Sequence, residues 1–341
     1  MRLRQLLWIL VAPAVMACDA GLSEPVDGPF LGVQAELYLN QALDVMELNS
    51  IRRYEIDWTA FRAQARADAE AAGSTVPADV YPAIEAALER IGDGHSFFLP
   101  PGGTARDPSI PPTSGPPPAP SSALVAPGVG YLEVTTFNGG GPANDSLASE
   151  YHALIEAVDT LGTSCGWVVD LRANLGGNMW PMLAGVGPVL GEDTVGYFVE
   201  PDSVETPWIY AAGEAGMPDQ VVATADPPYA LLSPGPAVAV LTDAETASSG
   251  EAIAVAFRGR TDTRSFGAPT WGVSTANSGF VLEDGAAIFL TVAAMADRER
   301  TAYGMELVPD EVIEGGDKTG EPATDAVLAA AVDWLEGRGC T

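Results

Sequence analysis

The chain has 341 residues and a formal net charge of −30, from 16 Lys or Arg residues against 46 Asp or Glu residues. The electric field of such a negative chain repels nucleic acid and anionic membrane surfaces. No nucleic-acid partner is therefore expected. Hydrophobic residues make up 47% of the chain and charged residues 18%, a composition that indicates a folded globular protein and excludes a disordered one.

The first residues have the composition of an export signal. Two arginines precede an apolar run over residues 6–15, which is too short to span a bilayer. Cys18 follows this run, as in a bacterial lipoprotein signal that is cleaved before the cysteine and lipidated on it. We expect a signal peptide over residues 1–18, a tether over residues 19–29, and an exported protein in the periplasm or at the cell surface that meets a membrane only through its lipid anchor. Cleavage without lipidation is the alternative.

Apolar residues at helical spacing predict an N-terminal helical subdomain over residues 30–100. Its second helix has Asp57 as a plausible N-cap and ends near Gly73, and its third runs from about residue 78 to 91. Residues 101–128 are rich in Pro, Gly and Ser, which predicts an exposed linker.

From residue 129 to the C-terminus, short apolar runs alternate with amphipathic ones. This alternation predicts an α/β core domain over residues 129–341 with some antiparallel strands and a C-terminal helix. Strands are expected at 129–137, 166–174, 195–201, 206–212, 237–243 and within 264–313, and helices at 146–161, 179–191, 248–259 and 323–337.

The chain has three cysteines, and if Cys18 carries a lipid, Cys165 and Cys340 remain as a pair. An exported protein can oxidise such a pair, and the disulfide would hold the C-terminus against the core. Two free buried thiols are the alternative. No CxxC or Cys/His cluster is present, so no metal site is expected.

A serine nucleophile needs a general base, and the chain offers only two histidines and one lysine, Lys318. His152 lies within a predicted helix, on the face expected to be polar, so we interpret it as a surface residue. His95 lies in "GDGHSFF", directly after a predicted helix end and before two aromatic residues. Catalytic groups are often carried on loops of this kind, which makes His95 the stronger candidate.

Ser248 and Ser249 follow a buried strand and begin a helix, whose N-terminus offers free N–H groups to a developing oxyanion. One serine could instead be only an N-cap, with Glu251 in the first turn, and both roles can coexist. In "DLRANLGGN", the turn at Gly176 and Gly177 allows a backbone N–H to approach a substrate carbonyl closely. Neither a dinucleotide fingerprint nor a phosphate loop is present, and no cofactor is expected.

These stretches in this order resemble the tail-specific, or C-terminal processing, serine proteases, the family that includes tricorn protease and the repeats of the retinoid-binding protein of the eye. The resemblance covers about residues 90–313 and rests on "IGDGHS", "VGYLEVTTFN", "GWVVDLRANLGGN", "VAVLTDAETASSGEAIAVAF", "FGAPTWGVS" and "ELVPDEVI". It implies a crotonase/Clp protease-like core of mixed sheet and helices. It also implies Ser248 as nucleophile, with the N–H of Ser249 and of Gly176 or Gly177 as oxyanion hole.

Two departures from the family pattern matter. Residues 101–128 are far too few for the peptide-binding PDZ domain that many members carry at that place. Lysine-dependent members carry their base in a G-x-PTFGKG stretch, whereas "GAPTWGVS" has Val273 at that position. The resemblance therefore points to the histidine-dependent, tricorn-like branch, with His95 as the base.

The residue that orients His95 is left open by the sequence. Late acidic residues of the core supply the candidates Glu306 and Asp297, and Asp93 is a further possibility. The resemblance implies a serine endopeptidase or carboxyl-terminal processing peptidase that hydrolyses exported peptides or unfolded proteins through an acyl-enzyme. The alternative is a non-catalytic ligand-binding lipoprotein of the same fold.

Overall fold

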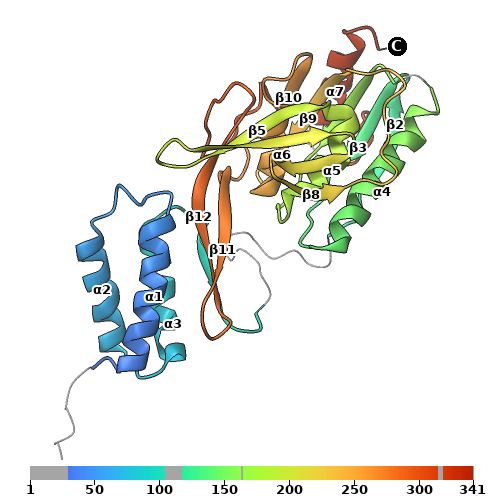
Figure 1. Ribbon diagram of the computed structural model, residues 1–341. Helices are drawn as coiled ribbons and strands as arrows, with labels where there is room; N and C mark the ends of the chain where they lie inside the picture. Colours follow the sequence, from blue (N-terminus) through green and yellow to red (C-terminus); the bar gives the residue numbers. More distant parts are fainter. Residues whose placement is uncertain (1–29, 104–116, 163, 314–317, 341) are drawn as a thin grey trace, which may run out of the picture.

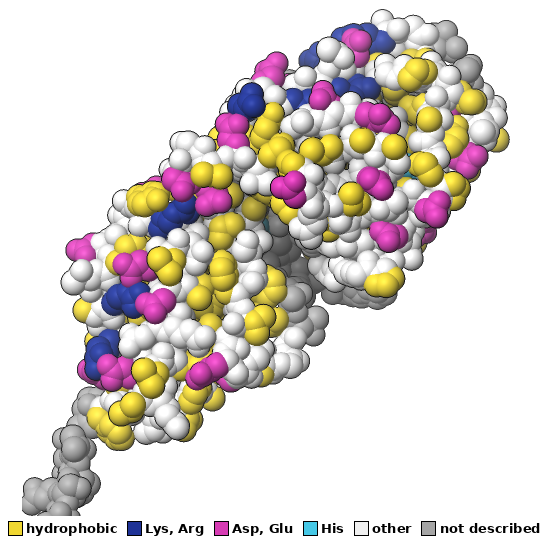
Figure 2. Space-filling model, viewed as in Figure 1, with side chains coloured by type: hydrophobic (Ala, Val, Ile, Leu, Met, Phe, Trp, Pro, Cys, Tyr) yellow, Lys and Arg dark blue, Asp and Glu magenta, His cyan; other side chains and the backbone are white. Residues whose placement is uncertain are grey.

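The computed structural model describes residues 30–103, 117–162, 164–313 and 318–340. The expected signal peptide, the tether and Cys18 lie outside the described residues. A bundle of three helices stands apart from a larger α/β lobe, and the hairpin β11–β12 lies between them (Figure 1). Acidic side chains are spread over both lobes on the face seen in Figure 2. None of the described helices is long and apolar enough to cross a membrane.

The helical lobe follows the sequence prediction closely. Asp57 caps the second helix, since its side chain accepts hydrogen bonds from the N–H groups of Thr59 and Ala60. The last helix ends at Gly92, whose φ of 72° is the left-handed conformation that glycine adopts readily. The elements are α1 (Val33–Asn49), α2 (Trp58–Ala71), the 3-10 turn η1 (Pro77–Val80) and α3 (Tyr81–Ile91).

An antiparallel sheet of seven strands joins the two lobes. Strand β12 is its centre, because it pairs with β1 of the helical lobe, with β11, and with β5 of the α/β lobe. Side chains of β12, among them Ile288 and Leu290, complete the core of the helical lobe, so this lobe has no separate core of its own. The strands are β1 (Phe97–Leu99), β5 (Asp193–Val199), β6 (Glu205–Ala211), β7 (Glu214–Met217), β8 (Gln220–Thr224), β11 (Thr275–Val281) and β12 (Ala287–Ala296).

The second sheet has six strands in the order β13-β10-β9-β4-β3-β2. Strands β3, β4, β9 and β10 run parallel, so their carboxyl ends lie at one edge, where ligand sites of α/β proteins form. The strands are β2 (Ser121–Ala126), β3 (Val129–Glu133), β4 (Gly166–Asp170), β9 (Ala237–Thr242), β10 (Thr263–Gly267) and β13 (Glu311–Val312).

Strand β2 lies inside the segment that the sequence predicts as a linker, so the expected boundary at residue 128 is too late. The chain turns at Gly128, with φ of 71°, and β2 pairs antiparallel with β3. Because β2 is an edge strand and mostly exposed, it lacks the buried apolar face from which a strand is predicted.

Helices cover both faces of the six-stranded sheet. Val169 and Val240 pack with α4 (Pro142–Asp159), α5 (Met179–Leu190) and α6 (Ser249–Phe257). The alternate residues Val168 and Leu241 pack with α7 (Ala326–Glu336) on the other face. This alternation buries both faces of the parallel strands, which explains their continuous apolar runs.

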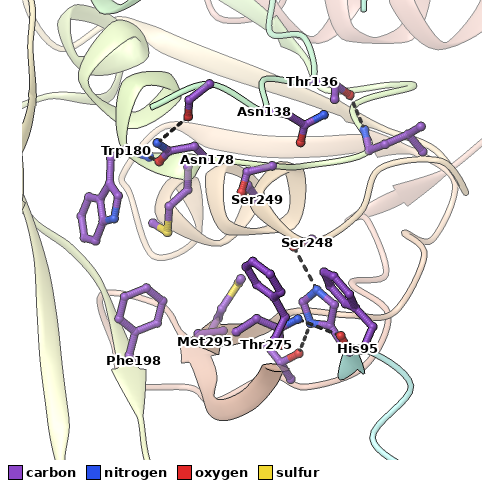
Figure 3. Close-up of a pocket in the computed structure, with 18 of the residues that line it drawn as sticks. His95, Thr136, Asn138, Asn178, Trp180, Phe198, Ser248, Ser249, Thr275 and Met295 are labelled. Carbon is purple, nitrogen blue, oxygen red and sulfur yellow. Dashed lines mark hydrogen bonds between the residues drawn. The ribbon is translucent and has the colours of Figure 1, made fainter. Parts of the chain in front are cut away.

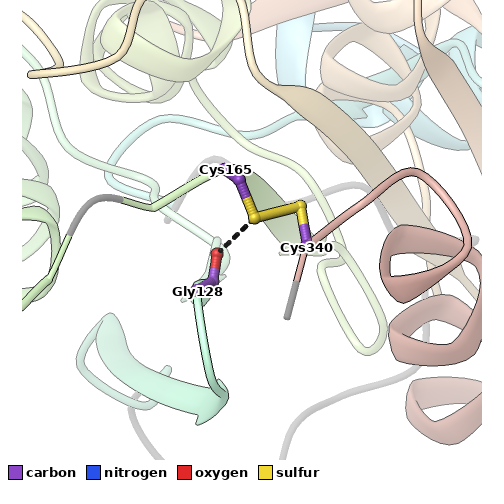
Figure 4. The surroundings of a disulfide bond; sticks show 3 residues. All are labelled: Gly128, Cys165 and Cys340. Carbon is purple, nitrogen blue, oxygen red and sulfur yellow. Dashed lines mark hydrogen bonds between the residues drawn. A yellow bond between two sulfur atoms is a disulfide. The ribbon is translucent and has the colours of Figure 1, made fainter.

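The C-terminal helix is held to the sheet by a disulfide at one end and by ion pairs at the other. Cys165, just before β4, and Cys340, just after α7, are joined in a disulfide (Figure 4). At the other end of the helix, the buried Arg172 guanidinium lies 2.7 Å from both Asp170 and Asp325, the α7 N-cap. Both ends of α7 are thereby fixed on the core.

Candidate active site

Ser248 occupies the tight turn between β9 and α6, with φ of 50°, a conformation that is uncommon for any residue but glycine. Its N–H donates to Glu251 Oε2 at 2.8 Å. Glu251 is fully buried and also accepts hydrogen bonds from Thr270 Oγ1, Gly272 N and Val273 N. Burial raises the pKa of Glu251, and these four donors act in the opposite direction. The Glu251 carboxyl therefore fixes the backbone of the turn that presents Ser248.

His95 reaches Ser248 from the other lobe. The Ser248 Oγ lies 3.1 Å from His95 Nε2, within hydrogen-bond distance (Figure 3). The backbone of His95 is held on both sides: its N–H donates to Asp93 Oδ1, and its carbonyl accepts from Asn277 Nδ2 at 2.7 Å. Asp93 thus fixes the loop rather than the ring. The structure brings together the serine and the histidine that the sequence selects.

The other ring nitrogen of His95 faces a hydroxyl group that sequence reasoning missed. Thr275 Oγ1 lies 2.7 Å from His95 Nδ1, in a buried contact. The structure brings neither predicted acidic candidate to this position. Asp297 instead accepts hydrogen bonds from Tyr303 Oη and from the backbone of its own turn, and Glu306 is exposed. No local motif distinguishes Thr275, because only the pairing of β11 beside the His95 loop brings it there.

The Gly-Gly turn lies against the start of α6. A Cβ added at Gly176 would lie 2.8 Å from the Ser249 nitrogen, so only glycine permits this approach. The Gly176 N–H donates to Asn174 Oδ1 at 2.9 Å, and the Ser249 hydroxyl donates to the Gly177 carbonyl at 2.6 Å. Within the described part of the chain, the N–H groups of Gly177 and Ser249 have no acceptor. Of the two glycines considered, Gly177 therefore has the available donor.

A cleft of about 490 Å³ lies around the Ser248–His95 pair. Trp180 and Phe198 meet edge to face at 6.2 Å on one side of it (Figure 3), and Phe97 stacks on Phe289 at 4.8 Å. Among the described residues that line the cleft, none carries a formal charge. The lining side chains include the apolar Phe97, Leu175, Met179, Trp180, Phe198, Phe289 and Met295 and the polar Thr136, Asn138, Asn178, Thr275 and Asn277.

The other candidate bases are engaged elsewhere. His152 is buried, so the expectation of a surface histidine is wrong: residues near Tyr229 cover that face of α4. Its Nε2 donates to the Ala184 carbonyl at 3.0 Å and its Nδ1 accepts from the Tyr229 N–H at 2.8 Å. Lys318 pairs with Glu133 at 2.8 Å. The described residues contain no group of three or more His, Cys, Asp or Glu residues that could hold a metal ion.

The mixed α/β architecture is that of the S41 proteases. The model of Peptidase family S41 matches residues 128–313, more than half of the chain, and the chain belongs to this family. Family S41 is a family of peptidases. The N-terminal lobe that carries His95 lies outside the matched range.

Two curated relatives are similar over part of their length. The chain is 28% identical to the nisin-resistance protein of Lactococcus lactis subsp. lactis over 207 residues, which cover 61% of this chain and 60% of that protein. It is 29% identical to the chloroplastic carboxyl-terminal-processing peptidase 2 of Arabidopsis thaliana over 176 residues, 51% of this chain and 29% of that protein. The matched regions therefore span less than two thirds of either relative.

Solved structures share the fold across most of the chain. A lipoprotein from Streptococcus agalactiae has a TM-score of 0.67 at 20% identity, with 89% of this chain and 97% of that chain covered. The photosystem II D1 C-terminal processing protease has a TM-score of 0.56 at 15% identity, with 82% and 93% covered. At these identities the likeness shows a common fold.

Proposed function

We propose that the protein is a serine peptidase of the histidine-dependent kind, in which Ser248 is the nucleophile and His95 the general base. The single observation that carries the proposal is the 3.1 Å contact between Ser248 Oγ and His95 Nε2 inside the cleft. A ligand-binding protein has no need of this contact, so it favours catalysis over the non-catalytic alternative.

The reaction proceeds in two halves. Ser248 Oγ bonds to the scissile carbonyl carbon while its proton passes to His95 Nε2. The N–H groups of Ser249 and Gly177 donate to the oxyanion of the tetrahedral intermediate. The C–N bond then breaks as His95 returns the proton to the leaving amine, and an acyl ester remains on Ser248. Water, deprotonated by His95, hydrolyses the ester and releases the new carboxyl terminus.

The cleft supports peptides or unfolded proteins as substrates. Its aromatic and methionine side chains can bury apolar side chains that flank the scissile bond, and its amide and hydroxyl groups can pair with a peptide backbone. We therefore expect cleavage next to large apolar residues in preference to charged ones.

Incubation of the purified mature protein with a mixed-sequence peptide library, read by mass spectrometry, tests this function. Ser248→Ala and His95→Ala should each lower kcat at least about 1,000-fold. Ser249→Ala keeps its backbone N–H and should retain far more activity than Ser248→Ala. Exposed Ser146 on α4 supplies a matched control, Ser146→Ala, with wild-type activity. Full activity in Ser248→Ala would refute the assignment.

We also propose that the protein works outside the cytoplasm, anchored by a lipid on Cys18. The support is the cysteine directly after an apolar signal-like run, together with a fold neighbour described as a lipoprotein. In a bacterial host the wild-type protein should sediment with membranes, and Cys18→Ala should move it to the soluble exported fraction. An unchanged distribution would contradict the anchor.

A further inference from the structure

The Ser248–His95 pair leaves one question of catalytic geometry, namely what fixes the His95 ring. We propose that Thr275 is the positioning residue of His95, and that strand β11 holds this histidine in register with the nucleophile. The proposal rests on the proposed function and extends it to a residue outside the Ser–His pair.

The contact between Thr275 and His95 is short and enclosed. The Thr275 Oγ1 to His95 Nδ1 distance is 2.7 Å, and the exposed fractions of the two residues are 7% and 3%. Thr275 begins β11, where it pairs with Ala294 of β12, and its N–H donates to the Val273 carbonyl. The hydroxyl is thus carried by a strand that is itself fixed in the sheet.

A second residue of β11 acts on the same histidine. Asn277 lies two positions after Thr275, and its Nδ2 donates to the His95 carbonyl at 2.7 Å. Its Oδ1 accepts from Thr291 Oγ1 at 2.9 Å, which sets the amide orientation. A single strand therefore contacts both the ring and the backbone of His95.

The chemistry of the base determines the direction of the Thr275 hydrogen bond. His95 Nε2 must be free of a proton to accept one from Ser248, so the ring proton lies on Nδ1. Nδ1–H then donates to Thr275 Oγ1, and the hydroxyl oxygen accepts. Thr275 thereby supplies an acceptor for the Nδ1–H of the catalytic tautomer and fixes the ring plane, and it does so before and after His95 takes the Ser248 proton.

Substitutions at Thr275 test the proposal through kinetics. Thr275→Val keeps the shape and removes the acceptor, and should lower kcat about 10- to 100-fold with little change in KM, since the tautomer and ring plane are no longer fixed. Thr275→Ser restores the acceptor and should recover most of kcat. A matched control is Thr242→Val, which removes a buried hydroxyl bonded to the Ala268 carbonyl of the neighbouring loop. It should lower stability while kcat stays at the wild-type value.

Imidazole 15N NMR supplies a readout that does not depend on activity. The chain has only two histidines, and His152, with Nε2–H bonded to a carbonyl, is the internal reference for the opposite tautomer. Wild-type His95 should show Nδ1–H, and Thr275→Val should shift it toward Nε2–H.

The two measurements separate the possible failures. An Nε2–H tautomer of His95 in the wild type, or identical His95 spectra and kcat in Thr275→Val, would overturn the positioning role of Thr275. If instead Ser248→Ala retains activity while the His95 spectra change as described, the proposed function fails and the structural role of Thr275 stands.

Discussion

At the scale of single residues, the adjacent serines differ in what their hydroxyl groups contact. Ser248 Oγ lies beside His95, whereas Ser249 Oγ donates to the Gly177 carbonyl and ties the start of α6 to the Gly-Gly turn. The Ser248 N–H is satisfied by Glu251, a capping interaction typical of helix N-termini. Capping is therefore compatible with the proposed reactivity at this turn, because the backbone N–H of Ser248 serves the cap and its side chain is left for the reaction.

His152 makes stability depend on pH. Burial lowers the pKa of His152 below its ordinary value of 6.5, and its Nδ1 must stay unprotonated to accept from the Tyr229 N–H. As pH falls below about 6.5, the unfolded chain binds a proton at this residue before the folded one does. The contribution of neutral His152 to the free energy of unfolding is therefore present above pH 6.5. It is lost progressively as the pH falls from 6.5 toward the lowered pKa of the folded state.

Urea unfolding at pH 7.5, 6.5 and 5.5 tests this dependence. His152→Gln removes the titrating group, so the difference in unfolding free energy between wild type and variant should shrink as pH falls. A difference that stays constant over this range would show that His152 does not titrate on unfolding.

At the scale of elements, the sequence predicts best where burial is regular. The α/β core strands and helices of residues 129–341 were largely predicted, since parallel strands are buried on both faces and helices carry apolar stripes. Exposed or short strands such as β2 and β7 were missed because they have no such pattern.

Only those residues of the candidate site that carry a local sequence signal can be predicted. Ser248, His95 and the glycine turn carry local signals, namely a helix start, a loop after a helix end and a Gly-Gly pair. Thr275 carries none, because its position depends on pairing between strands far apart in sequence. The burial of His152 could not be predicted, because the sequence of a single helix does not reveal which loop covers it.

An ion pair between elements of different lobes offers a test of their placement. Arg53, in the segment after α1, has only 10% of its side chain exposed and lies 3.1 Å from Glu200 and 3.3 Å from Asp202, which follow β5. Arg53→Ala should loosen the contact between lobes and lower kcat/KM about two- to fivefold, the range expected for a partly exposed pair.

Arg66→Ala is the matched control for this measurement. Arg66 pairs with Glu36 and Glu70 inside the helical lobe, so its loss removes ion pairs of similar kind without touching the other lobe. Steady-state kinetics of both variants should show reduced kcat/KM for Arg53→Ala alone. Equal effects of the two substitutions would contradict a role for the contact between lobes.

At the scale of the whole molecule, the candidate active site is composite. His95 follows the last helix of the helical lobe, Ser248 begins a helix of the α/β lobe, and the β11–β12 hairpin between them supplies Thr275 (Figures 1 and 3). The proposed chemistry at Ser248 therefore depends on the two lobes keeping one arrangement. The pairing of β12 with strands of both lobes provides that arrangement.

Covalent labelling by a fluorophosphonate probe tests the central claim most directly, because the probe reacts with serines activated by a base. Intact mass and peptide mapping of the wild-type protein should show one adduct, on Ser248, which is absent in Ser248→Ala and forms far more slowly in His95→Ala. A folded wild-type protein that gains no adduct, or gains it on another residue, would contradict the account.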